Sequence, residues 1–373
     1  VAEAGRRRPS WGGTRWGGEP WKIGGASSWG GITFDPAPNT VFYGTANRGT
    51  WDPDLRPGDN LYATAAMARD ADTGQLKWAY QYTPHDAWDY DGVNEHIVAD
   101  IPFNGATRKV VVHFDRNGFA YTIDRNTGEV LVAQPFQYLN WSTGIDLASG
   151  RPTLVDSKQT HQGRMTTNIC PSSTGARDQQ PAAFSPRTHL FYTPATNLCM
   201  DYGGIEAKYI AGTPYVGAAV KMYAGPGGNR GEFLAWDAGT GKKGWGIKEN
   251  FPVWAGAPGT AGGGGFCGPM DGHVQGGHAG GRGGTRGRQW TNHTPTWRAT
   301  TWTWAWRLGA ASAASTGSEP RGASRFGRPQ CPRTCPILAD CDPRGAQWRK
   351  VTGAACRIWK TVCSSPPAPV SRI

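Results

Sequence analysis

The stretch "RDADTGQLKW", Arg69–Trp78, decides the fold. It predicts the end of one strand, a tight Asp-x-x-Thr-Gly turn, and a second strand that closes on Trp. "WDAGTGKKGW" (Trp236–Trp245) repeats the Asp, Thr-Gly and Trp at the same spacing, and "IDRNTGEVL" (Ile123–Leu131) has Leu where Trp would stand. "IDLASGRP" (Ile145–Pro152) is a weaker copy. Repeated hairpins of this kind are typical of β-propeller blades, which stack because one blade cannot bury both faces alone.

Other segments also have the composition of short strands. They are rich in Val, Ile, Tyr, Phe and Thr, and Asn, Gly, Pro or Asp bounds them. These segments are "NTVFYGTAN" (Asn39–Asn47), "KVVVHFD" (Lys109–Asp115), "FAYTID" (Phe119–Asp124) and "HLFYTPAT" (His189–Thr196). No segment keeps a helical apolar stripe over three turns. We therefore predict an all-β fold, an incomplete β-propeller.

The composition changes after Gly262. Residues 1–262 carry 24 basic and 24 acidic side chains, whereas residues 263–373 carry 15 and 4, so the net charge of +11 lies in the last part. "GGFCGPMDGHVQGGHAGGR" (Gly264–Arg282) resembles a damaged blade. We predict three parts: an irregular N-terminal segment at 1–20, a partial propeller at 21–282, and a disordered low-complexity tail at 283–373.

Three explanations of the tail stay open. Its Gly, Arg and Trp residues would suit an RNA-binding arm, and Cys331, Cys335 and Cys341 could form a metal knot. A shifted reading frame or sequence error is the explanation that we favour. Because residues 1–262 are neutral as a whole, we expect no nucleic-acid partner. No window is apolar enough to span a membrane, and the chain starts at Val1 without the apolar core of a signal peptide.

The loop "TPHDAWDYDGVNE" (Thr83–Glu95) concentrates negative charge among aromatic residues. Asp89 and Asp91 are two apart, so on an extended segment both carboxylates point to one side while Trp88 and Tyr90 point to the other. Two anions that close repel each other unless a cation lies between them or one is protonated. The loop predicts a hard metal ion. A solvated turn is the alternative, although such a turn does not need Trp and Tyr.

Several segments together closely resemble the pyrroloquinoline-quinone (PQQ)-dependent alcohol dehydrogenases of the methanol/ethanol family. They are Gly24–Asn60, Ala68–Glu95 and His113–Glu129, and the resemblance runs from about Trp21 to Gly262. That family consists of eight-bladed propellers of the bacterial periplasm. The resemblance implies oxidation of a primary alcohol, of the methanol or ethanol class, to the aldehyde. It also implies PQQ and a metal ion as cofactors, and a c-type cytochrome as electron acceptor.

The resemblance also implies a catalytic base and metal ligands. Asp89 of "WDY" corresponds to the base, which takes the hydroxyl proton of the alcohol while hydride passes to the quinone. Asn47 of "GTAN" corresponds to a metal ligand through its amide oxygen. Asp91-Gly92 follows the lanthanide-dependent branch, where calcium enzymes usually have Ala-Gly. A trivalent ion favours one more anionic oxygen, so we expect a lanthanide(III), with calcium as the alternative.

Five residues are expected at the cofactor by the same resemblance: Ser27, Trp29, Arg116, Asp178 and Trp254. Trp29 corresponds to the indole under the quinone, where a flat aromatic ring suits a flat cofactor. Arg116 corresponds to a guanidinium that hydrogen-bonds the quinone carbonyls. Taken alone, a propeller Trp is more often simple packing, and an Arg after Asp is more often part of a surface ion pair.

Cys170 and Cys199 lie in segments that resemble those of a structural disulfide in the family. Closing this loop of 29 residues would stabilise the fold by roughly 3–4 kcal/mol. Two free buried cysteines are the alternative, but a disulfide fits an oxidising periplasm. A homodimer is one assembly open to the full-length protein.

Two departures from the family lower the activity that we expect. A Glu ligand and an adjacent Cys pair would lie before Val1, and the last blades are absent or scrambled. We therefore expect this polypeptide to bind metal and PQQ poorly and to have no turnover. A non-catalytic propeller that uses Asp89 and Asp91 as a calcium loop stays open as an alternative function. A glycoside hydrolase is disfavoured, because carboxylates two apart on one strand do not flank a sugar bond from opposite sides.

Overall fold

The computed structural model describes residues 24–270, apart from residue 214, and residues 275–278. In this part of the chain β-strands dominate, and the helical elements are two short 3-10 turns, η3 (Pro53–Leu55) and η4 (Asp156–Lys158). The predicted all-β class is therefore confirmed. No helix among the described residues is long and apolar enough to cross a membrane. The N-terminal segment 1–20 and the predicted tail at 283–373, with its cysteines, lie outside the described residues.

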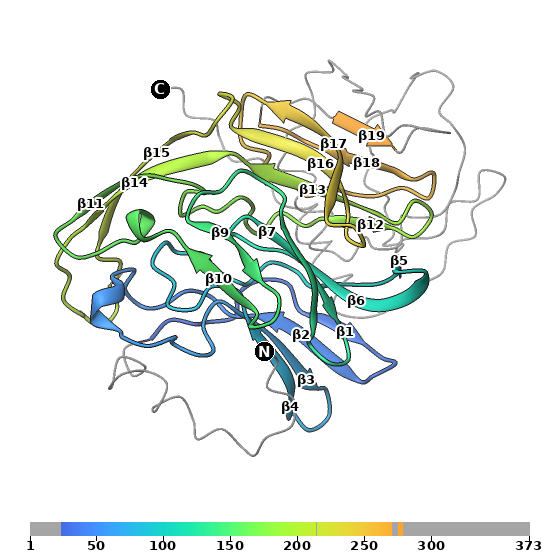
Figure 1. The fold of residues 1–373 in the computed structure, drawn as a ribbon, viewed down its shortest axis with the longest axis horizontal. Coiled ribbons are helices and arrows are strands. Elements are labelled where there is room, and N and C mark those ends of the chain that lie inside the picture. The colour runs from blue at the N-terminus through green and yellow to red at the C-terminus, as the bar shows by residue number, and fades with distance from the viewer. Residues whose placement is uncertain (1–23, 214, 271–274, 279–373) are drawn as a thin grey trace, which may run out of the picture. The chain divides into compact units, whose positions relative to one another are not determined.

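Three antiparallel sheets of four strands form the framework (Figure 1). Sheet I consists of β1 (Thr33–Asp35), β2 (Thr40–Gly44), β3 (Ala65–Asp70) and β4 (Leu76–Gln81). Sheet II consists of β5 (Ile97–Phe103), β6 (Ala106–Phe114), β7 (Phe119–Asp124) and β8 (Val130–Pro135). Sheet III consists of β12 (Ala183–Ser185), β13 (Leu190–Thr196), β16 (Gly231–Asp237) and β17 (Lys242–Glu249). Four-stranded sheets in sequence order are the blades of an incomplete propeller.

Three smaller sheets complete the described fold. One pairs β9 (Ser142–Asp146) with β10 (Arg151–Leu154), and another pairs β18 (Gly264–Cys267) with β19 (Gln275–His278). The third consists of β11 (Met165–Ile169), β14 (Leu198–Gly204) and β15 (Ala218–Ala224). In the third sheet, Cys170 directly after β11 forms a disulfide with Cys199 in β14.

Alternation along β6 lets sheet II share a core with both neighbouring sheets. Val111 is fully buried in the cluster that contains Trp78 of sheet I, whereas Val110 and Val112 are buried in the cluster that contains Trp236 of sheet III. Successive residues of a strand point to opposite faces. The run of three valines therefore packs against two sheets at once, as a blade inside a propeller must.

The Asp-x-x-Thr-Gly turns are held by the aspartate side chain. Asp70 Oδ1 accepts hydrogen bonds from the backbone of Asp72 and from both the backbone and the hydroxyl of Thr73, at 2.9–3.2 Å. Asp124 and Asp237 accept equivalent backbone hydrogen bonds in the β7–β8 and β16–β17 turns. The bonds from Thr73 lower the pKa of Asp70 to about 2, because they stabilise the carboxylate.

The tryptophan that follows the first turn joins two blades. Trp78 in β4 is buried, and its Nε1–H donates to the carbonyl of Arg125 in the β7–β8 turn at 3.0 Å. Gly128 of the same turn lies against the indole: a Cβ at this position would be 2.8 Å from Trp78 Cδ2. Glycine is required there also because its φ is +77°. The repeat thus supplies both partners, a Trp from one blade and a Gly from the next.

Replacing Trp78 should separate these two contributions. Trp78→Phe keeps most of the apolar contact but loses the hydrogen bond, so we expect a loss of about 1 kcal/mol in the free energy of unfolding. Trp78→Ala should lose about 3–5 kcal/mol. Urea unfolding followed by circular dichroism measures both. As a control, Phe34→Ala changes a ring that is 54% exposed. Equal losses for Trp78→Ala and Phe34→Ala would refute the role of Trp78 in joining the two blades.

Candidate functional site

The loop between β4 and β5 carries the predicted carboxylates, but its backbone is not extended. Asp89 has a φ of +70°, so the expectation of an extended segment is wrong at this residue. Trp88 and Tyr90 still point away from the carboxylates, because their rings stack on each other at 5.6 Å in the core. Trp88 Nε1–H donates to the carbonyl of Lys158, and the Tyr90 hydroxyl donates to that of Pro171. A strained residue between two anchored rings is typical of a functional loop.

The first aspartate of the loop shapes the backbone and does not join the other two. Asp86 is buried, and its Oδ1 accepts the backbone N–H of Trp88 at 3.2 Å and of Tyr90 at 3.1 Å. Burial raises the pKa of Asp86, and the Arg56 guanidinium opposes that shift. Arg56 also donates to the backbone carbonyl of Asp86. The three aspartates of the loop therefore have two different roles.

Asp89 and Asp91 converge on the guanidinium of Arg116, which follows β6. Arg116 Nη1 lies 3.2 Å from Asp89 Oδ2 and 3.3 Å from Asp91 Oδ2. The same nitrogen donates to the carbonyl of Ser173 at 3.2 Å. The two carboxylates thus share one side of the loop, and a positive group of the protein lies next to both.

A third carboxylate holds the other edge of the same guanidinium. Asp178 Oδ1 accepts from Arg116 Nη2 at 2.8 Å and from Nε at 3.2 Å. Arg116 and Asp178 are each less than a tenth exposed. When all three aspartates are ionised, the group of Asp89, Asp91, Asp178 and Arg116, here called the carboxylate cluster, carries two excess negative charges.

The pKa shifts follow from this imbalance. Burial raises the pKa of Asp89 well above its ordinary value, and Asp91 raises it further, while Arg116 opposes both. Burial raises the pKa of Asp91 to about 6, also against Arg116. Burial by itself would lower the pKa of Arg116, but Asp91, Asp178 and Asp89 raise it above its usual range. A bound cation would relieve the repulsion between the carboxylates.

Asn47 lies beside Asp91 through its backbone. Its N–H donates to Asp91 Oδ1 at 2.5 Å, and its carbonyl accepts from the backbone of Ala26. Within the described part of the chain, its carboxamide has no hydrogen-bond partner, which leaves the amide oxygen available to a cation. No three His, Cys, Asp or Glu side chains among the described residues make a metal cage on their own. A cation here would therefore need Asn47 or additional ligands.

Besides Arg116 and Asp178, three more residues were predicted at the cofactor, and only some of them lie near the carboxylate cluster. Trp29 is 44% exposed, and its ring centroid lies 5.6 Å from Arg116 Cζ, so a flat aromatic surface borders the carboxylate cluster. Ser27 is exposed and lies close by, because its carbonyl accepts from the backbone of Ala46. Trp254 is 39% exposed, and no described contact connects it to Arg116 or to the carboxylates.

Two supporting residues escaped the sequence analysis. Ser173 contributes only a backbone carbonyl, which no residue type signals. Gly175 lies so close to Arg116 that a Cβ would be 2.6 Å from the Cβ and Cγ of that arginine, and its φ is +76°. The disulfide between Cys170 and Cys199 ties this segment to β14. The glycine of "STGARD" was the only feature of the sequence that could have indicated a close backbone approach in this segment.

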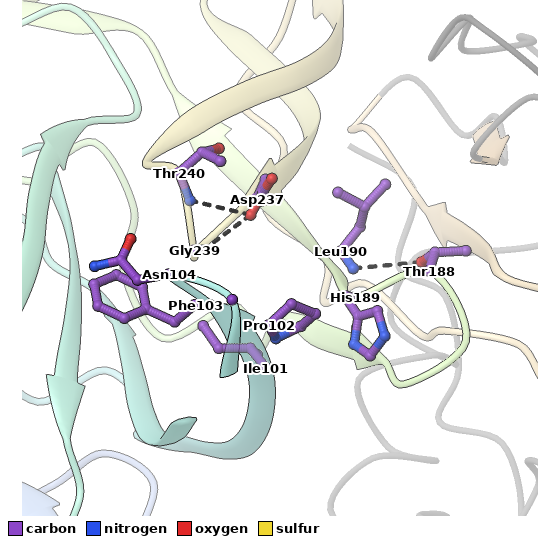
Figure 2. Close-up of a pocket in the computed structure, with 11 residues that line it drawn as sticks. Ile101, Pro102, Phe103, Asn104, Thr188, His189, Leu190, Asp237, Gly239 and Thr240 are labelled. Carbon is purple, nitrogen blue, oxygen red and sulfur yellow. Dashed lines mark hydrogen bonds between the residues drawn. The ribbon is translucent and has the colours of Figure 1, made fainter. Parts of the chain in front are cut away.

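A separate hollow of about 280 Å³ lies between three hairpin turns (Figure 2). The turns are those of β5–β6, β12–β13 and β16–β17, which supply Phe103, His189 and Thr240 among other lining residues. Asp237 is the acidic residue in this lining, but its Oδ1 already accepts from Gly239 and Thr240 (Figure 2). The hollow therefore presents fewer charged groups to a ligand than the carboxylate cluster does.

Comparison with known proteins places the propeller sheets in a family. A family model described as "PQQ: Glucose/ethanol/alcohol dehydrogenase, beta-propeller domain" matches residues 4–134. The chain is 52% identical over 261 residues to a lanthanide-dependent methanol dehydrogenase of Methylacidiphilum fumariolicum, a match that covers 69% of this chain and 43% of the relative. It is 38% identical over 268 residues to methanol dehydrogenase [cytochrome c] subunit 1 of Methylorubrum extorquens, with coverage of 70% and 43%.

Solved structures agree with this relationship. A europium-containing methanol dehydrogenase superposes with a TM-score of 0.73 at 48% identity, covering 77% of this chain and 50% of that one. A quinohemoprotein alcohol dehydrogenase from Comamonas testosteroni gives a TM-score of 0.64 at 32% identity, over 71% of this chain and 40% of that one. The chain spans less than half the length of the curated relatives that it matches.

Removing the central charge should be costly. Arg116→Gln leaves three buried carboxylates without their partner, so we expect a loss of about 3–5 kcal/mol in the free energy of unfolding in metal-free buffer. Chemical unfolding at pH 7 measures it. Arg151→Gln is the matched control, because Arg151 makes a bidentate pair with Asp59 that is 52% and 39% exposed. That control should lose less than about 1 kcal/mol; similar losses for both variants would contradict the account.

Proposed function

The propeller sheets of this chain are those of the PQQ-dependent alcohol dehydrogenases, and from that relationship we propose that the protein oxidises a primary alcohol of the methanol or ethanol class to the aldehyde. The proposed cofactors are PQQ and a lanthanide(III) ion, with calcium as the alternative metal. The observation that carries the proposal is the convergence of Asp89, Asp91 and Asp178 on Arg116 beside the exposed ring of Trp29.

The residues present fit both groups. Asp89, Asp91 and the carboxamide of Asn47 would hold the metal ion, since carboxylate and amide oxygens suit hard cations. The excess negative charge favours a trivalent ion over a divalent one. Trp29 would lie against the flat cofactor, and Arg116 would donate hydrogen bonds to it. When bound, PQQ supplies the acceptor for hydride and the metal ion supplies Lewis acidity.

The side chains of this chain would then bind, orient and move a proton. Asp89 is the proposed base, which accepts the hydroxyl proton of the alcohol at a carboxylate oxygen. Asp91 is fixed by the Asn47 N–H, so its negative charge is held at one place. Asp178 orients Arg116 through two hydrogen bonds. The stacked rings of Trp88 and Tyr90 are buried, so they shield from water the side of the loop that faces the core.

Partners and location belong to the same proposal. The printed name of a related protein, methanol dehydrogenase [cytochrome c] subunit 1, supports a c-type cytochrome as the electron acceptor. The disulfide between Cys170 and Cys199 supports an oxidising compartment such as the periplasm. The homodimer, the boundaries at residues 20 and 282, and the lack of turnover by this polypeptide alone stay predictions. A metal-binding propeller without PQQ chemistry is the competing function.

Metal binding tests the first part of the proposal. Terbium(III) luminescence, excited through tryptophan, should report binding at the carboxylate cluster. Asp91→Ala should weaken terbium binding by about tenfold or more, because a hard ion loses an anionic ligand worth at least about 1.4 kcal/mol. Asp54→Asn is the control, since Asp54 is an exposed carboxylate that pairs with His161. An unchanged affinity in Asp91→Ala would place the ion elsewhere.

Cofactor binding separates the enzyme from the metal-binding module. Titration of PQQ into the full chain with lanthanum(III) should quench tryptophan fluorescence weakly, and Trp29→Ala or Arg116→Gln should weaken binding by about tenfold or more. Terbium binding without any quenching by PQQ would favour the non-catalytic alternative. Robust dye-linked methanol oxidation by the chain would instead show that the predicted lack of turnover is wrong.

A further inference from the structure

A second buried group of titratable side chains lies directly behind Arg116, and the proposed mechanism does not use it. The ring of His113 stacks on Tyr82 at 4.3 Å and on His96 at 4.5 Å. The Tyr82 hydroxyl lies 3.0 Å from His96 Nε2, and Asp115 Oδ2 lies 3.0 Å from His113 Nε2. All four side chains are fully buried. Asp115 immediately precedes Arg116 in the chain.

The hydrogen bonds of His113 restrict where its protons can be. His113 Nδ1 lies 3.3 Å from the backbone carbonyl of Glu95, which can only accept, so this contact is a hydrogen bond only in the tautomer whose Nδ1 carries the hydrogen. A neutral imidazole then has a bare Nε2, which needs a donor. The group that faces Nε2 is Asp115 Oδ2. Either His113 is a buried cation beside a buried anion, or Asp115 is a carboxylic acid that donates to it.

The surroundings favour the neutral pair. Burial lowers the pKa of His113 to about 3, and Arg177 lowers it too. Burial raises the pKa of Asp115 well above its ordinary range, with a further contribution from Asp86, while the Asn117 N–H and Arg116 oppose it. The pair has no exposed surface through which water could solvate separated charges. One shared proton, located on Asp115, satisfies both side chains without separating charge.

Asp115 also fixes the turn that carries Arg116. Its Oδ1 accepts the backbone N–H of Asn117 at 2.9 Å, and its carbonyl accepts that of Gly118 at 3.2 Å. Arg116 therefore lies inside a turn that the two ends of Asp115 close. When Asp115 is neutral, the positive charge of Arg116 interacts with only the three carboxylates of the carboxylate cluster. An ionised Asp115 would add a fourth carboxylate to the pull on one guanidinium.

We propose that Asp115 is a positioning residue for Arg116, held as a neutral carboxylic acid whose O–H donates to His113 Nε2 and whose other oxygen holds the turn. Its importance for alcohol oxidation rests on the proposed function, but the protonation state and the effect on Arg116 do not. Asp115→Asn is the informative variant. An amide presents the same donor to His113 and the same acceptor to Asn117 as the neutral acid does, whereas a carboxylate would not.

The experiment uses the full chain without metal or PQQ, so failure of the proposed function cannot affect it. Arginine-labelled protein gives the Nε–H signal of Arg116, assigned by its loss in Arg116→Gln. Exchange of this hydrogen with solvent should stay within about twofold of wild type in Asp115→Asn and become at least about tenfold faster in Asp115→Ala. Asp237→Ala, which removes the aspartate from a distant turn, should leave the exchange rate unchanged.

Infrared spectroscopy tests the protonation state of Asp115 by a readout that does not depend on hydrogen exchange. In protein whose aspartate is labelled with ¹³C, wild type at neutral pH should show a carboxylic-acid C=O band that is lost in Asp115→Asn. Loss of a carboxylate band instead would overturn the neutral acid. Fast exchange of Arg116 Nε–H in Asp115→Asn as well as in Asp115→Ala would overturn it too, and unchanged exchange in both variants would overturn the positioning role.

Discussion

The structure depends on one enclosed charge imbalance, in which three carboxylates surround the single guanidinium of Arg116. The chain brings the charges together from three places: Asp89 and Asp91 from the β4–β5 loop, Arg116 from the β6–β7 turn, and Asp178 from the segment before β12. Such an arrangement is costly for a stable fold alone, because buried charges repay their desolvation only when they are well paired. The cation that we propose at this site would compensate the excess negative charge.

The propeller framework makes that enclosure possible. Blade stacking through Trp78 and Gly128 fixes sheet I against sheet II, and these sheets supply the two loops that meet at the cluster. The disulfide between Cys170 and Cys199 fixes the third segment, which carries Ser173 and Asp178. Each charged side chain therefore belongs to a turn whose ends are held by strands. The charges can remain close because the backbone cannot relax away from them.

The sequence predicted best those features in which a side chain contacts residues only a few positions away in the chain. The Asp-x-x-Thr-Gly turns were visible because Asp70 bonds to residues two and three positions later. Arg116 and Asp178 pair across 62 positions of the chain. The resemblance to a family placed each of them at the cofactor, but nothing in the sequence indicated that they pair. The positive φ of Asp89 was missed because tertiary anchoring of its aromatic neighbours overrides the local preference for an extended chain. The role of Asp86 was not visible in the sequence either, because its carboxylate acts on the backbone of Trp88 and Tyr90.

Thermal unfolding in the presence of lanthanum(III) or calcium tests the central claim most directly, when wild type is compared with Asp89→Asn/Asp91→Asn. Any ion that binds the folded state raises the unfolding temperature according to its affinity. The account predicts a larger rise with lanthanum(III) than with calcium at equal ionic strength, and loss of that difference in the double variant. Equal rises for the two ions in wild type, or the same lanthanum effect without these carboxylates, would contradict it.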